Sequence, residues 1–241
     1  MDKVNPTGTG YFSLNRKTDH TPGKYSVAIG WGTVASGHSS HAVGYRTTAS
    51  GERSHAEGSR TTASGVRSHA EGSETTASGY SSHAEGEVTT ASGYCSHAEG
   101  SRTTASGDGS HAEGGYTTAS EVGSHAEGWS TIASGLCSHA EGFHTTASYK
   151  SQYVEGEYNI ADPSTANADT RGTYVHIVGN GTADNARSNA LTLTWDGDLW
   201  HSGKLSHGNS ISAEGLYSYS GGSETSALGN YSHAEGVKTV A

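Results

Sequence analysis

The sequence predicts an all-β protein whose chain winds into a parallel β-solenoid of 14-residue repeats. Three observations lead to this fold class. Gly accounts for 35 of the 241 residues, whereas Met occurs once, Phe twice and hydrophobic residues make up only 31%, so the chain lacks the side chains of a conventional core. A 14-residue motif recurs in frame, which is the signature of a repeat architecture. Each motif holds two five-residue segments that end in Gly, which suits short strands rather than helices.

The repeat runs from Ser26 and fades at Gln152. It reads SVAIG-TVASG from Ser26, SHAVG-TTASG from Ser40, and SHAEG-TTASG or a close variant in the turns that start at Ser54, Ser68, Ser82, Ser96, Ser110, Ser124 and Ser138. That gives about nine turns, and stacking at about 4.8 Å per turn makes a rod on the order of 40 Å long. We expect the glycines at the corners, where they adopt left-handed backbone angles at little cost.

Side-chain alternation along a strand assigns the faces of each turn. In SHAEG, the Ala points to one side and the His and Glu point to the other. In TTASG, the first Thr and the Ala share one face, while the second Thr and the Ser share the opposite face. Because Ala is central in both segments, we expect the two Ala faces to meet inside the coil, where only small side chains fit. The His/Glu pairs then face outward on one sheet and the Thr/Ser pairs on the other.

The first two turns indicate that the His/Glu face is an interface between chains. Val27 and Ile29 stand where later turns have His and Glu, and the second turn has His41 and Val43. Apolar residues on an outer face suggest burial by association, and three-fold association is the natural arrangement. The predicted trimer interface comprises Val27, Ile29, His41, Val43, His55, Glu57, His69, Glu71, His83, Glu85, His97, Glu99, His111, Glu113, His125, Glu127, His139 and Glu141.

SVAIG followed by a 14-residue period resembles the head domain of trimeric autotransporter adhesins. The resemblance covers roughly residues 26–156 and resumes near the C-terminus. It implies a left-handed parallel β-roll that forms a homotrimer, with the Val27/Ile29 face towards the trimer interior. The chain departs from that pattern because a charged or polar pair replaces the hydrophobic pair in most turns.

Residues 157–209 interrupt the repeat and predict a small β insertion. Thr173–Gly179 alternates like a strand, and Ala190–Leu205 is typical of a hairpin around Asp196-Gly197; Asn180-Gly181 suggests a second hairpin-type turn. The chain thus divides into an N-terminal segment (1–25), the β-roll (26–156), the insertion (157–209) and resumed β-roll repeats (210–241).

A second resemblance concerns the segments outside the repeats. Tyr174–Trp200 is similar to a segment that follows SHAEG-type repeats in tail fibre or appendage proteins of bacteriophages and prophages, and residues 5–17 are similar to the start of such proteins. The resemblance implies a fibre or spike segment of the virion tail that attaches to a host surface glycan or protein and contacts other tail proteins. Because no secretory signal, heptad stalk or membrane anchor is found in the sequence, we favour this function over the alternative, a bacterial surface adhesin head.

Composition and motifs exclude several other classes. The net charge of −10 disfavours nucleic acid, whose phosphates attract Lys and Arg. No stretch approaches the roughly 20 apolar residues of a membrane helix. No catalytic or phosphate-binding motif is present, so we expect neither an enzyme nor a cofactor, and a tail-associated polysaccharide hydrolase is disfavoured. Cys95 and Cys137 lie three turns apart, about 14 Å, which is too far for a disulfide.

Three sets of side chains are candidates for function. We interpret the His/Glu ladder as an interchain network; a pH switch and, least favoured, a metal site of axial histidines are the alternatives. The Thr/Ser ladder is interpreted as a solvated face, with ice binding as the disfavoured alternative; it includes Thr48/Ser50, Thr62/Ser64, Thr76/Ser78, Thr90/Ser92, Thr104/Ser106 and Thr118/Ser120. Aromatic corner residues either contact a receptor or shield the turns: Trp31, Tyr45, Tyr80, Tyr94, Tyr116, Trp129 and Phe143.

Overall fold

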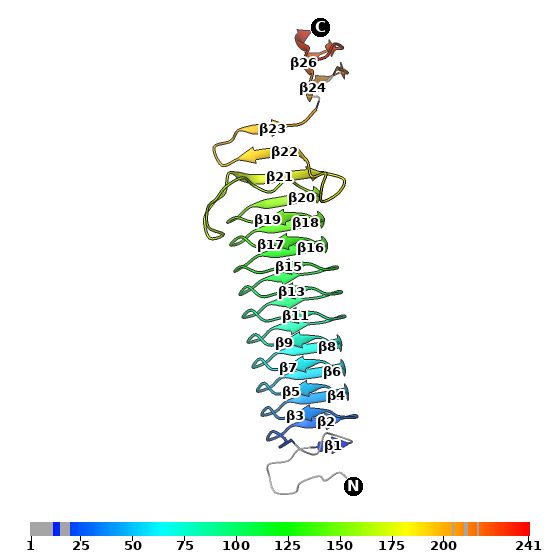
Figure 1. Ribbon diagram of the computed structural model, residues 1–241, viewed down its shortest axis with the longest axis vertical. Coiled ribbons are helices and arrows are strands. Elements are labelled where there is room, and N and C mark those ends of the chain that lie inside the picture. Colours follow the sequence, from blue (N-terminus) through cyan, green and yellow to red (C-terminus); the bar gives the residue numbers. More distant parts are fainter. Residues whose placement is uncertain (1–11, 15–19, 204, 210–211, 216) are drawn as a thin grey trace.

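The protein is an elongated rod of stacked turns (Figure 1). The computed structural model describes residues 12–14, 20–203, 205–209, 212–215 and 217–241. The other residues of the predicted N-terminal segment 1–25, including most of residues 5–17 that resemble the start of tail proteins, lie outside the described part. The described part consists of strands, turns and loops with no helix, which confirms the all-β parallel solenoid. No helix of the described residues is therefore long and apolar enough to cross a membrane.

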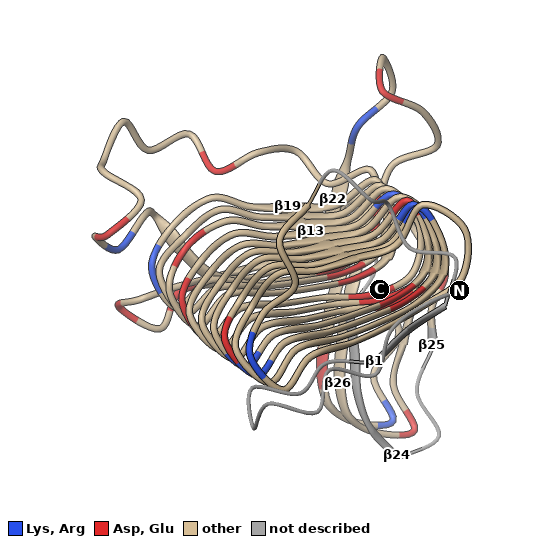
Figure 2. Cartoon of the chain, turned by 90° about the horizontal axis from the view of Figure 1, so that it is seen from below, with Lys and Arg blue, Asp and Glu red and all other residues tan. Residues whose placement is uncertain are grey.

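Two parallel sheets form the roll, and seen along its axis the turns superimpose into a flattened coil (Figure 2). The SHAEG-type segments build the first sheet, from β1 (Phe12–Leu14) through β2 (Val27–Ile29), β4 (His41–Tyr45), β6 (His55–Ser59), β8 (His69–Ser73), β10 (His83–Ala84), β12 (His97–Ala98), β14 (His111–Ala112), β16 (His125–Trp129), β18 (His139–Phe143) and β20 (Tyr153–Glu157). The TTASG-type segments build the second, β3 (Val34–Ala35), β5 (Thr48–Ala49), β7 (Thr62–Ala63), β9 (Thr76–Ala77), β11 (Thr90–Ala91), β13 (Thr104–Ala105), β15 (Thr118–Ala119), β17 (Ile132–Ala133) and β19 (Thr146–Ala147).

The register between turns follows the 14-residue period. His83 pairs with His97 in the first sheet, and Thr90 pairs with Thr104 in the second. The nine strands of the second sheet agree with the predicted nine turns. The sequence period therefore places each residue type in a column along the rod.

The core consists of small side chains, as predicted. Alanines of both sheets are fully buried from Ala42 to Ala147 and form one continuous cluster. The Ser that opens the SHAEG segment is also buried along the roll, and in most turns its hydroxyl donates to the carbonyl three residues earlier, for example from Ser82 to Gly79 at 2.8 Å. The first Thr of each TTASG segment completes the core, and at the centre of the roll its hydroxyl, as in Thr89, has no hydrogen-bond partner among the described residues.

The two glycines of each repeat have different roles, which corrects the prediction that both adopt left-handed angles. The SHAEG glycine does so, with φ of +102° at Gly86. The TTASG glycine does not have a positive φ; instead, a Cβ on Gly79 would lie 1.9 Å from the carbonyl oxygen of Gly93 in the next turn. Close approach of two backbones therefore favours glycine at this position, which Glu121 and Tyr149 take in two turns. The left-handed angles at this corner belong to a neighbouring variable residue such as Arg67 (φ 60°).

The C-terminal end of the roll is closed by three further strands of the first sheet. β21 (Tyr174–Asn180) pairs in parallel with β20. β22 (Asn189–Thr194) and β23 (Leu199–His201) follow in antiparallel order, so the predicted hairpin around Asp196-Gly197 is confirmed. The predicted tight turn at Asn180-Gly181 is wrong: residues 181–188 separate β21 from β22 and form a turn of their own, with Ala183 bridged to Ala186.

Side-chain amides cap the last strand of the second sheet, because β21 has no counterpart there. Asn159 accepts a hydrogen bond from the Thr146 N–H at 2.8 Å and donates to the Thr146 carbonyl at 3.2 Å. The side-chain oxygen Oε1 of Gln152 accepts a hydrogen bond from the Ser148 N–H at 2.8 Å, and its side-chain nitrogen Nε2 donates to Asp162 at 2.9 Å. The amides thus replace the backbone of a further turn, and both are almost fully buried.

The remaining strands resume the 14-residue register. β24 (Leu205–Asn209), β26 (Tyr219–Ser223) and β28 (His233–Val237) form one parallel sheet, and β25 (Ser212–Ala213) pairs with β27 (Ser226–Ala227). Tyr219 lies opposite His233. The same two-sheet arrangement therefore recurs beyond the hairpin (Figure 1).

Candidate functional site

The histidines of the first sheet form a column of stacked rings on its outer face. From His41 to His125, successive ring centroids lie 4.8 Å apart, and the rings of His83 and His97 are parallel to within 2°. The alternation of the strands thus aligns the predicted ladder, and Val27, Ile29, His41 and Val43 continue it at the N-terminal end. Whether this face joins chains stays a prediction.

A glutamate column runs beside the histidines. Within a turn, the His Nε2 and Glu Oε2 atoms are 3.4 Å apart in His139/Glu141 and 3.8 Å apart in His97/Glu99. The carboxylates and the SHAEG glycines line a groove of about 1110 Å³ along the rod. Because the glycines carry no side chain, the floor of this groove is bare backbone.

Burial makes protonation of three histidines of the column unfavourable. The Nε2 atoms from His55 to His139 are shielded from solvent and lack a hydrogen-bond partner among the described residues. Burial, followed by the like charges of the neighbouring histidines, lowers the pKa of His55, His83 and His125 below its ordinary value. The charges of the adjacent glutamates raise the pKa, but their effect is smaller than that of burial and does not reverse the shift.

We expect the free energy of unfolding to decrease as the pH falls from about 7 towards 5. At pH values between the lowered pKa of these histidines in the folded chain and the ordinary value near 6.5, the unfolded chain binds more protons than the folded chain. The contribution of these histidines to stability is therefore complete above this pH range and lost below it. Thermal melts followed by circular dichroism from pH 8 to pH 5 measure the effect. Replacing two column residues, His83→Gln and His125→Gln, should flatten the dependence. A constant or rising midpoint on acidification would contradict it.

The spacing of the column does not suit a metal ion within one chain. Four groups bring one ligand atom of each member within 4.8 Å of the others: Glu57/His69/Glu71, Glu71/His83/Glu85, His97/Glu99/His111 and His125/Glu127/His139. Atoms that share a tetrahedral zinc ion lie roughly 3.4 Å apart. The His97 and His111 rings stack at 4.8 Å, and their Nε2 atoms are 3.8 and 4.0 Å from Glu99. The in-register backbone sets this wider spacing.

The predicted receptor residues occupy two edges of the coil rather than one. The first corner follows the SHAEG glycine and holds Trp31, Tyr45, Tyr116, Trp129 and Phe143; the second corner follows the TTASG position and holds Tyr80 and Tyr94. All except Tyr80 are exposed. Both cysteines lie at the second corner as free, exposed thiols, in agreement with their predicted separation.

The outer face of the second sheet carries the Thr/Ser ladder, with the Thr residues half-buried and most of the Ser residues exposed. Ile132 interrupts the array, because it stands in the Thr position and is 41% exposed. The face is therefore not a continuous hydroxyl array.

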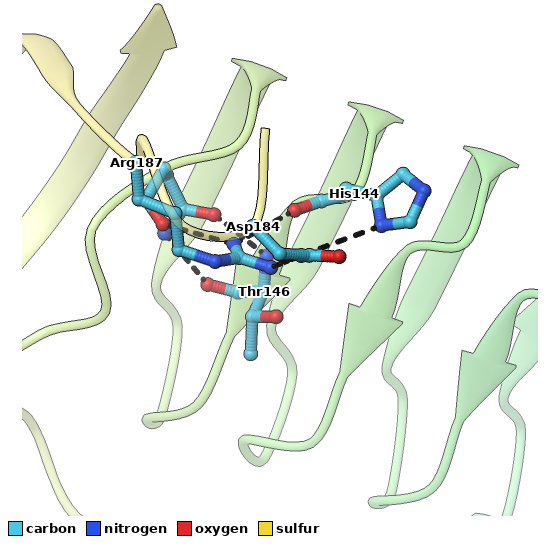
Figure 3. Close-up of polar contacts among 5 residues, drawn as sticks. His144, Thr146, Asp184 and Arg187 are labelled. Carbon is cyan, nitrogen blue, oxygen red and sulfur yellow. Dashed lines mark hydrogen bonds and ion pairs between the residues drawn. The ribbon is translucent and has the colours of Figure 1, made fainter. Parts of the chain in front are cut away.

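Sequence patterns gave no sign of a polar cluster that joins the 181–188 connection to the roll (Figure 3). Arg187 donates to the carbonyl oxygens of His144 and Asn159, both at 3.1 Å, and to Asp184 at 2.6 Å. The same Asp184 oxygen lies 3.7 Å from Nδ1 of His144. These residues lie outside the periodic positions that identify the roll, and the contacts depend on how the connection folds back.

Comparison with known families concerns the turns of the roll. The YadA head domain repeat (2 copies) matches residues 22–47, 35–54, 42–68, 56–82, 70–94 and 98–120. These turns are similar to YadA head domain repeats. No curated protein matches the chain. Repeats of this family build structural, trimeric adhesin heads on bacterial cell surfaces, which favours the surface adhesin alternative over the tail fibre predicted from the sequence.

Proposed function

We propose that this chain is the head module of a homotrimeric adhesin on a bacterial cell surface. The match of YadA head domain repeats to the first seven turns carries the proposal. A roll with continuous ladders is a stiff rod, suited to holding receptor-binding side chains away from the surface to which it belongs. The exposed aromatic residues at its corners are the proposed receptor contacts.

The outer face of the first sheet is the proposed trimer interface. Its column of partly exposed glutamate carboxylates, which lines the groove along the rod, offers hydrogen-bonding groups to a second copy. Val27, Ile29 and Val43 add apolar contact at one end. Buried polar pairs can specify register between chains rather than add stability, and a column that repeats every turn suits that role.

Cysteine cross-linking tests this interface. In a Cys95→Ser/Cys137→Ser background, Glu99→Cys places a thiol on the proposed interface, while Ser106→Cys places one on the exposed outer face of the second sheet. We expect a native mass of three chains for both variants and oxidative cross-linking between chains for Glu99→Cys alone. A single-chain mass, or equal cross-linking of the two variants, would overturn the proposed trimer.

A tail fibre or appendage of a bacteriophage or prophage is the second candidate. The resemblance of Tyr174–Trp200 to a segment of such proteins favours it. Immunogold labelling of the native source distinguishes the two: an adhesin labels the cell envelope, whereas a fibre labels particles. Tail tube and baseplate genes beside the coding sequence would also favour the fibre.

A further inference from the structure

Trp129 differs in its orientation from the corner aromatics that stack in pairs. Trp31 stacks on Tyr45 with centroids 5.1 Å apart and planes within 12°, and Tyr80 stacks on Tyr94 in the same way. In such ladders the rings cover one another's faces. The Trp129 ring lies 5.1 Å from Tyr116, which holds the other variable position of the preceding turn, and is tilted by 56° to it. In register with Trp129, the preceding turn carries Gly115, so the indole has no ring to stack on there.

A glycine makes room for this tilt. A Cβ on Gly115 would lie 2.5 Å from Cε3 and 2.6 Å from Cζ3 of Trp129, so the six-membered ring of the indole lies directly over Gly115. Equivalent positions in other turns carry a side chain, as in Ser59, Ser73 and Ser101. The indole thus occupies the space that a side chain at position 115 would fill, and 48% of Trp129 remains exposed to solvent.

Neighbouring side chains extend this surface. Tyr116 is 47% exposed, and Phe143, in register with Trp129 on the following turn, is 38% exposed. The Arg102 guanidinium lies 5.5 Å from the centre of the Tyr116 ring. Three partly exposed aromatic rings therefore lie on adjacent turns at this corner, with the Arg102 guanidinium beside one of them.

We propose that Trp129, Tyr116 and Phe143 form a platform that binds a sugar ring of a neutral glycan. The C–H face of a pyranose carries partial positive charge and suits the negative face of an indole, while its hydroxyls can bond to a nearby polar group such as the Arg102 guanidinium. The net charge of −10 repels acidic polysaccharides. The inference rests on the proposed function, because it names the receptor class of the adhesin.

The test uses the full chain labelled with 5-fluorotryptophan, whose fluorine spectrum reports Trp31, Trp129, Trp195 and Trp200 separately. Cellotriose, maltotriose and chitotriose are the neutral probes, and trigalacturonate is the acidic probe. We expect at least one neutral probe to shift the Trp129 resonance while the other three stay in place. Binding of no probe, or a shift confined to the other tryptophans, would overturn the platform, and a preference for trigalacturonate would overturn the neutral class.

Gly115→Ser is the decisive variant, because it keeps every aromatic residue and introduces the side chain found at equivalent turns. Its hydroxymethyl group displaces the indole, so we expect at least a fivefold loss of affinity by calorimetry, and at least tenfold for Trp129→Ala. Trp200→Ala, an exposed tryptophan of the hairpin strand β23 and not one of the corner residues, is the matched control and keeps wild-type affinity. Wild-type affinity in Gly115→Ser would overturn the proposed geometry. If these variants bind sugar normally yet the protein is trimeric and attaches to cells, the platform fails while the proposed function stands.

Discussion

A leucine in place of Ala98 is expected to destabilise the centre of the roll by about 3 kcal/mol, at the upper end of the range for overpacked cores. Ala98 is fully buried on β12, between alanines of the preceding and following turns, Ala84 and Ala112. The turn spacing is fixed by backbone hydrogen bonds, and the two sheets are separated by little more than methyl groups. Three added carbon atoms can be accommodated only by forcing the sheets apart.

The damage should be local, because each turn of a solenoid contacts only its neighbours. Hydrogen exchange should show lost protection around Ser96–Gly107, with protection retained near Ala42 and Ala140, and thermal melts should show a lower midpoint. Thr89→Val is the control of nearly unchanged volume: it replaces a buried, unpartnered hydroxyl and should not reduce stability. Wild-type protection in Ala98→Leu would contradict a core of small side chains without spare volume.

The periodic features of the fold follow directly from the sequence. Strand alternation places Ala84 inside and His83 outside, and the constant 14-residue period aligns His83 with His97 without knowledge of any long-range contact. Every such assignment is repeated nine times, so local chemistry and global register agree. The glycine of TTASG shows what the sequence pattern cannot predict. Glycine recurs at this position because the backbone of the next turn lies close to it, and residue identity alone does not distinguish this reason from a left-handed backbone angle.

Features that occur once could not be predicted in the same way. The sequence marks Trp129 as one of seven corner aromatics, but its tilt depends on the absence of a side chain at Gly115, one turn earlier. The Arg187 cluster requires the path of residues 181–188, for which Asn180-Gly181 indicated the wrong turn. The orientation of a side chain and the path of a loop depend on the three-dimensional structure, and the repeat pattern in the sequence does not predict them.

The second large effect is expected from Asn159→Ala, at the end of the second sheet. Asn159 is 1% exposed and pairs with both backbone groups of Thr146. Alanine would leave a backbone N–H and a carbonyl of β19 without partners in a site closed to water. Each unsatisfied buried group costs about 1–3 kcal/mol, so we expect the variant to lose about 3 kcal/mol of stability.

Denaturant unfolding combined with hydrogen exchange measures this loss, which should be concentrated in the last turns, around Thr146 and Ser148. Asn159→Asp keeps the acceptor for the Thr146 N–H but loses the donor to its carbonyl and buries a charge, so it should not restore wild-type stability. Asn167→Ala, in the exposed loop nearby, is the matched control and should change stability by less than about 0.5 kcal/mol. Equal stability of the Asn159 and Asn167 variants would contradict the capping role. The last strand of the second sheet, β19, has no further strand to pair with. The amide of Asn159 takes the place of that strand and ends the second sheet, while the first sheet continues into the hairpin.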